Sequence, residues 1–189
     1  MSTTANRALG GPQAALESPE YLRTSLAAAM VLGARRGRFY REVRLHCINL
    51  LLTYADGCRA NCAYCGLAQS RPGACQEQSF IRVHWPVLPT EEIIERIDAY
   101  SGEVARICLS MVTNRRAYGD TIAVLRRLHQ RSDAPIAVLA SPNLLNDARL
   151  AELREAGAET LGIGLDAASE RVFARTRGAG VKGPLSWRQ

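Results

Sequence analysis

The chain has 189 residues, of which 47% are hydrophobic, and this is enough for one globular domain with a buried core. The net charge of +6 permits an acidic partner, but no basic run is interleaved with aromatic residues, so we expect no nucleic-acid-binding face. The six cysteines do not match a small secreted disulfide framework, no secretory signal opens the chain and no apolar run reaches membrane-spanning length, so we expect a cytoplasmic protein without membrane attachment.

The first elements in chain order are a tail and a helix. Residues 1–17 are rich in Ala, Gly, Ser and Thr without periodicity, which predicts a disordered tail. Ser18, Pro19 and Glu20 have the order of a helix start, with a capping residue, a proline at the first position and an early acid. We therefore expect a helix from Ser18 to about Arg36.

The chain then alternates between strand-like and helix-like segments. Residues 46–54 form a nearly continuous apolar run that predicts a strand buried on both faces. Later in the chain we expect a loop at 71–78 and a short extended segment at 80–85. Further strands are expected at 104–112, 135–140 and 159–165, and helices from Pro89 onward and at 120–130, 147–156 and 169–175. Four strand–helix units predict an α/β fold with a parallel sheet and right-handed crossovers.

Three cysteines follow the first of these strands at C-x₃-C-x₂-C spacing: Cys58, Cys62 and Cys65. Dense thiolates select zinc or iron–sulfur clusters. A closed zinc site needs four ligands, and Cys75 is an available fourth. A cubane cluster on three cysteines instead leaves one iron open for a substrate or cofactor. The other polar segments, Ser110 to Arg116, Ser141 to Asn143, and Asp166, also follow expected strands, where parallel sheets bind ligands.

With Tyr64 as the aromatic residue, this loop resembles the signature of radical S-adenosylmethionine (SAM) enzymes. The resemblance implies that the three cysteines hold a [4Fe–4S] cluster whose open iron binds SAM. An electron then cleaves SAM to methionine and a 5′-deoxyadenosyl radical. The implied fold is a partial (βα) barrel of the radical SAM type, truncated after about four units, with a core at 18–177 and an irregular segment at 178–189.

The resemblance also implies contacts to SAM from Tyr64, Ser110, Met111, Ser141, Asn143 and Asp166. Tyr64 is expected near the adenine, and Ser110 and Met111 occupy the place where the family often has Gly-Gly-Glu. Asp166 is expected directly at a strand end, accepting from the ribose hydroxyls. The alternatives are an N-cap role for Asp166 and a simple turn for Ser-Pro-Asn. No catalytic side chain is predicted.

Several strings, at 49–54, 62–68, 80–83 with 85–86, 110–113 and 162–168, resemble biotin-synthase-related proteins, particularly one subunit of two-component lipoyl synthases. The implied reaction is sulfur insertion into an octanoyl chain on an acidic carrier protein. The implied partners are a second radical SAM subunit and an electron donor such as ferredoxin or flavodoxin. The alternatives are a radical SAM enzyme acting on RNA or a biotin-like precursor, and a non-catalytic, metal-binding truncated paralogue.

The sequence also indicates possible roles for four arginines and two further cysteines. The arginines, candidates to clamp the SAM carboxylate or an acidic partner, are Arg115, Arg116, Arg175 and Arg177. The alternative is that these arginines face solvent, as arginines on helices more often do. Cys47 and Cys108 lie in expected strands and are interpreted as small buried hydrophobic residues.

Overall fold

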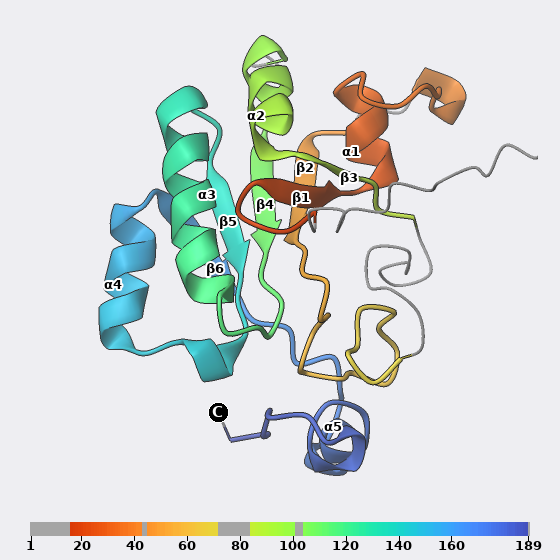
Figure 1. Cartoon of the computed structure of the whole chain (residues 1–189), viewed down its shortest axis with the longest axis vertical. Helices are drawn as coiled ribbons and strands as arrows, with labels where there is room; N and C mark the ends of the chain where they lie inside the picture. The colour runs from red at the N-terminus through yellow and green to blue at the C-terminus, as the bar shows by residue number, and fades with distance from the viewer. Residues whose placement is uncertain (1–15, 43–44, 72–83, 101–103, 189) are drawn as a thin grey trace, which may run out of the picture.

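The computed structural model describes residues 16–42, 45–71, 84–100 and 104–188, which form a mixed α/β fold (Figure 1). The strands are Tyr21–Thr24 (β1), Cys47–Leu52 (β2), Val87–Pro89 (β3), Arg106–Ser110 (β4), Ile136–Leu139 (β5) and Ala158–Gly162 (β6). The helices are Leu26–Val31 (α1), Thr90–Ala99 (α2), Ala117–Arg131 (α3), Asp147–Glu155 (α4) and Glu170–Thr176 (α5). No helix in the described part of the chain is long and apolar enough to cross a membrane.

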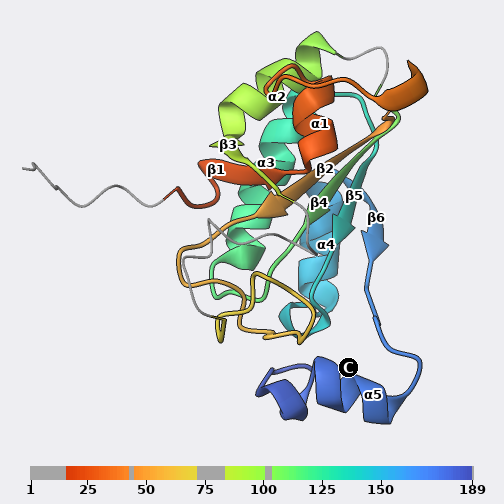
Figure 2. The same ribbon diagram turned by 90° about the vertical axis from the view of Figure 1, so that its right-hand side faces the viewer.

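The described strands form one six-stranded sheet in the order β3-β1-β2-β4-β5-β6. The run β2-β4-β5-β6 is parallel, as the alternation in the sequence predicts. Helices α2, α3 and α4 stand side by side along this sheet (Figures 1 and 2). The carboxyl ends of the parallel strands therefore meet at one edge, which is the lower edge in Figure 1.

The predicted helix from Ser18 to Arg36 is wrong. Strand β1 occupies its first part and pairs antiparallel with both β2 and β3, so that Leu22 lies opposite Leu52 and Leu88. The Ser18 hydroxyl accepts a hydrogen bond from Thr53 N at 3.0 Å instead of capping a helix. Pairing with two distant strands satisfies the backbone of β1, and a local start signal cannot compete with that. Helix α1 begins only after Ser25, whose side chain accepts from Ala28 N.

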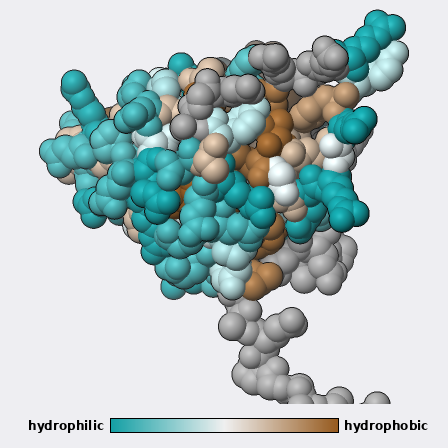
Figure 3. Space-filling view, turned by 90° about the horizontal axis from the view of Figure 1, so that it is seen from above, coloured by the Kyte–Doolittle hydropathy of each residue, from teal (hydrophilic) through white to brown (hydrophobic). Residues whose placement is uncertain are grey.

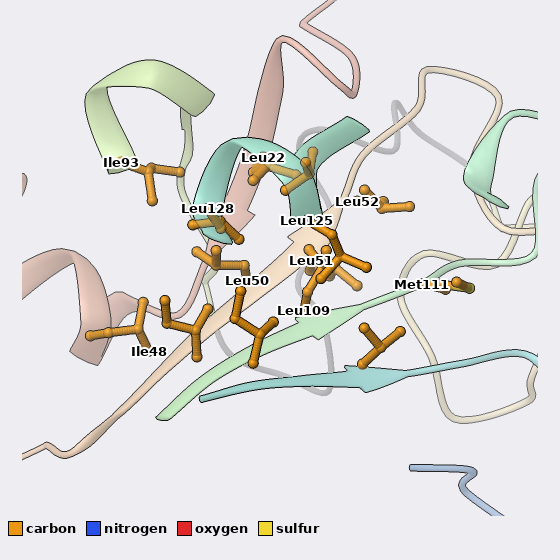
Figure 4. Packing of buried hydrophobic residues seen from close by; sticks show 14 of the residues in the cluster. Leu22, Ile48, Leu50, Leu51, Leu52, Ile93, Leu109, Met111, Leu125 and Leu128 are labelled. Carbon is orange, nitrogen blue, oxygen red and sulfur yellow. The ribbon is translucent and has the colours of Figure 1, made fainter. Parts of the chain in front are cut away.

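The largest apolar cluster lies between the sheet and the helices that cover it. Figure 4 shows Leu50 of β2 and Leu109 of β4 close to Leu125 and Leu128 of α3. All four side chains are buried, and Leu50 lies opposite Leu109 in the β2–β4 ladder. Burying such a side chain contributes about 1.5–3 kcal/mol each. This packing fixes the strands from which the loops at the carboxyl edge extend.

Replacing Leu109 by alanine is expected to lower the free energy of unfolding by about 2–5 kcal/mol, because it leaves a cavity in this cluster. Urea unfolding followed by circular dichroism measures the change. Leu150→Ala on α4 is the matched control, because Leu150 is 39% exposed and its truncation removes little buried contact. Equal losses in the two variants would contradict the assignment of Leu109 to the core.

The end of β6 and the position of α5 differ from the expectation. Strand β6 ends at Gly162, three residues before the predicted end at Leu165. Helix α5 begins after its predicted cap Ser169, but it lies beyond the carboxyl edge of the sheet (Figures 1 and 2). Phe173 of α5 packs with Ala60 and Leu185 in a separate small cluster. Helix α5 therefore packs on the cysteine loop and does not join the layer of helices along the sheet.

Other boundaries were predicted to within a few residues, although α3 begins at Ala117, earlier than the predicted residue 120. Most of the predicted tail at 1–17, the loop at 71–78 and the extended piece at 80–85 lie outside the described residues. The face seen from above in Figure 3 is mostly hydrophilic, with a strip of hydrophobic residues between the polar ones. It is opposite the edge that carries the cysteine loop in Figure 1.

Candidate active site

The cysteine loop leaves the carboxyl end of β2 and folds back on itself. Cys58 N donates to Leu67 O at 2.7 Å, and Gln69 N donates to Cys58 O at 3.0 Å. Gly57 has a φ of +72°, and a Cβ there would lie 2.9 Å from Leu67 O, so this turn requires glycine. Arg59 N donates to Thr113 O at 2.8 Å, which joins the loop to the segment after β4. The backbone thus fixes the position of the first cysteine.

The structure brings the three loop cysteines to one cavity of about 490 Å³ at the carboxyl edge of the sheet. Thr113 N donates to Cys58 Sγ at 3.2 Å. Burial raises the pKa of the Cys58 thiol, and backbone N–H groups of Ala60 and Thr113 oppose that shift. These N–H donors favour a thiolate, which is the form that binds a metal.

The donor set fits an iron–sulfur cluster better than a single ion. Within the described residues, no group of three His, Cys, Asp or Glu side chains converges closely enough to hold one metal ion. A cluster binds three cysteines through three different irons, so the sulfurs need not meet at one point. Cys75, the fourth ligand considered for zinc, lies outside the described residues.

Five of the six residues expected to contact SAM line the same cavity: Tyr64, Ser110, Met111, Ser141 and Asp166. Asn143 does not line it, and instead accepts a hydrogen bond from Ser141 Oγ at 2.9 Å. Ser141 Oγ also lies 2.8 Å from Thr113 Oγ1. Because the Ser141 proton points to Asn143, Thr113 donates in this chain of hydrogen bonds. Ser141 is therefore held in one orientation beside the cavity.

Asp166 connects the two sides of the cavity mouth. Tyr64 OH from the cysteine loop donates to Asp166 Oδ2 at 2.9 Å, and Arg177 Nη1 lies 2.6 Å from the same oxygen. Arg177 also donates to the Gly164 carbonyl, and its side chain is only 11% exposed. Its buried Nε has no hydrogen-bond partner, so this guanidinium keeps one free donor. Of the four candidate arginines, the cavity lining includes Arg177.

The predicted surroundings of Asp166 need two corrections. Asp166 is not directly at a strand end, because β6 stops at Gly162 and Asp166 has a left-handed φ of 50° in the following turn. The alternative N-cap role is wrong, because Ser169 caps α5 by accepting from Val172 N. Gly164 lies beside the carboxylate: a Cβ there would be 3.1 Å from Asp166 Oδ2. The glycine leaves room for the contact with Arg177.

Three polar or aromatic residues of the cavity had no individual role among the expectations from the sequence: Asn49, Thr113 and Trp85. Asn49 is the one polar residue of β2, and that was an available signal. Trp85 gave no local signal, because a distant side chain positions it. The buried Arg23 of β1 donates to the Trp85 carbonyl at 3.3 Å. By contrast, Arg116 pairs with Glu17 at 2.7 Å and does not line this cavity.

Comparison with models of known protein families matches residues 52–184 to the Radical SAM superfamily. The chain belongs to the radical SAM superfamily. The matched range contains the cysteine loop and all the cavity-lining residues from Cys58 to Arg177. Comparison with curated proteins and with solved structures gives no match.

As a member of the radical SAM superfamily, the protein is an enzyme that uses an iron–sulfur cluster and SAM. When bound, the cluster supplies the electron for reductive cleavage of SAM. The residues of this chain that are suited to hold it are Cys58, Cys62 and Cys65, with backbone donors at Ala60 and Thr113 supporting the first.

Proposed function

We propose that this radical SAM protein acts on an aliphatic chain, and specifically that it inserts sulfur into an octanoyl group on a carrier protein. The observation that carries the proposal is the apolar wall of the cavity that contains the cysteines. Its apolar lining residues are Leu51, Ala60, Leu67, Trp85, Met111, Val112, Leu139 and Ala140. Leu139 is 45% exposed, so the wall is open to an incoming chain.

A saturated chain as substrate would account for both the apolar cavity and the radical chemistry. The C–H bonds of a saturated chain are not acidic, so no side-chain base can activate them. In this proposal Leu139 and Met111 hold methylene groups of the chain in the cavity that the three cysteines also line. The resemblance of residues 162–168 and the other strings to lipoyl synthase subunits supports the octanoyl assignment.

The proposed partners follow from the same assignment. The chain has a net charge of +6, which complements an acidic carrier protein. A second radical SAM subunit and a ferredoxin or flavodoxin complete the proposed system. Among the polar residues that line the cavity, we propose that Asp166 and Tyr64 contact SAM. We propose that the cluster is of the [4Fe–4S] type.

The test uses a carrier protein bearing a perdeuterated octanoyl-lysine, incubated anaerobically with SAM, dithionite and the reconstituted full chain. We expect deuterium in the 5′-deoxyadenosine, because the hydrogen atom would come from the chain. Mass spectrometry measures the label, and unlabelled octanoyl carrier is the control. Cleavage of SAM with no label, or label only from deuterated RNA or a biotin precursor, would reject the octanoyl assignment. No SAM cleavage under any condition would favour the non-catalytic alternative.

A further inference from the structure

Two cysteines outside the loop contact each other across neighbouring strands. Cys47 Sγ of β2 lies 3.1 Å from Cys108 Sγ of β4. Both are free thiols and both are partly exposed, so they match the predicted small buried hydrophobic residues only in part. The distance is shorter than an ordinary contact between two sulfur atoms that are not bonded.

The strand ladder holds the pair in place. Strands β2 and β4 are parallel, and Asn49 pairs with Cys108 while Cys47 pairs with Arg106. The two thiols therefore meet diagonally, each leaning toward the other strand. Because both strands are central in the sheet, hydrogen bonds on both sides keep the two thiols next to each other.

The pair lies on the same face of the sheet as the cysteine cavity. Asn49 and Ser110 line that cavity, and each follows one of the two cysteines by two residues along its strand. Side chains two residues apart share a face and are separated by about 7 Å along a strand. The pair is thus close to the cavity and still distinct from the three loop cysteines.

We propose that Cys47 and Cys108 form a reversible intramolecular disulfide, a redox modification site separate from the cluster ligands. The co-reactant is a small disulfide such as glutathione disulfide. One thiolate attacks it, forming a mixed disulfide and releasing one glutathione. The second cysteine then displaces the other glutathione. Both S–H bonds break, the protein S–S bond forms, two protons pass to the glutathione thiols, and the oxidant gains two electrons.

The local environment slows disulfide formation through Cys47. Burial raises the pKa of Cys47 to about 12, the neighbouring Cys108 adds to the shift, and Arg106 opposes it. Only a small thiolate fraction of Cys47 exists at neutral pH, so exchange through this sulfur is slow there. Its rate rises with pH, because the thiolate is the attacking species.

The experiment maps thiols in the full chain carrying its cluster, incubated anaerobically with reduced or oxidised glutathione and then alkylated. Trypsin with an Asp-specific protease separates Cys47, in residues 45–55, from Cys58, in residues 56–59. We expect a linked pair of peptides, 45–55 with 107–115, that dithiothreitol releases. Alkylation of both cysteines should fall together by about tenfold in the oxidised sample.

The Cys47→Ser variant provides the control. In this variant Cys108 has no partner, so oxidation should give no linked pair of peptides and should leave Cys108 as a thiol or as a mixed disulfide with glutathione. Alkylation of both cysteines at the reduced level in the oxidised wild-type chain would overturn the proposal, and so would a Cys108 peptide linked only to 56–59. Both readings come from the wild-type chain, so they stand even if the variant fails to fold.

Discussion

Replacing Cys62 by alanine is expected to remove the iron–sulfur cluster from the reconstituted chain. Loss of a partner that only supports a metal ligand typically costs 10–100-fold in metal affinity, so loss of a ligand should cost at least about 100-fold. Cys58→Ala and Cys65→Ala should behave in the same way, because the three thiols line one cavity. The measurements are iron and sulfide content and the EPR spectrum of the reduced protein, with and without SAM.

The matched control is Cys47→Ala, which removes a cysteine from a strand instead of from the loop. It should keep its iron and sulfide and its EPR signal. Cluster loss in this control would mean that iron content reports general instability. Zinc retained by the wild-type chain, with no iron or sulfide after reconstitution, would contradict the assignment of the loop to an iron–sulfur cluster.

Replacing Asp166 by asparagine is expected to raise the Kd for SAM about 10- to 100-fold, the effect of losing one hydrogen bond to a charged group. The carboxylate is half exposed at the cavity mouth, where it accepts from Tyr64 and Arg177. In our proposal it accepts from the ribose hydroxyls as well. Anaerobic equilibrium dialysis of SAM against the cluster-loaded chain measures the change.

Two further variants separate the role of the charge from that of the surrounding contacts. Tyr64→Phe removes the hydroxyl that donates to Asp166 and keeps the ring, so its effect should be smaller than that of Asp166→Asn. Asp147→Asn, at the exposed start of α4, should leave SAM binding unchanged. Equal affinity in the wild type and Asp166→Asn, with the same cluster content, would remove Asp166 from the SAM site.

A buried arginine links the antiparallel part of the sheet to the site. Arg23 of β1 is 1% exposed and donates to Thr53 Oγ1 at 3.3 Å and to the Trp85 carbonyl. Trp85 in turn lines the cavity. The missed strand β1 therefore also sets one wall of the candidate active site, through a side chain far away in the sequence.

The sequence by itself identified the three candidate metal ligands and predicted the parallel part of the sheet. The spacing of Cys58, Cys62 and Cys65 is local, so one loop carries all three thiols. The apolar run of β2 and the helical period of α3 are equally local signals. Their alternation was enough to place the polar segments after Ser110 and Ala140 at one edge of the sheet.

Only the tertiary structure decided which distant residues complete the site. Strand β1 was missed because its backbone is satisfied by β2 and β3, and such pairing overrides a local helix start. The contact between Arg177 and Asp166 depends on α5 packing on the cysteine loop through Phe173. The contact between Cys47 and Cys108 depends on the register of two strands far apart in the chain. Each is set by long-range packing, which residue spacing alone does not encode.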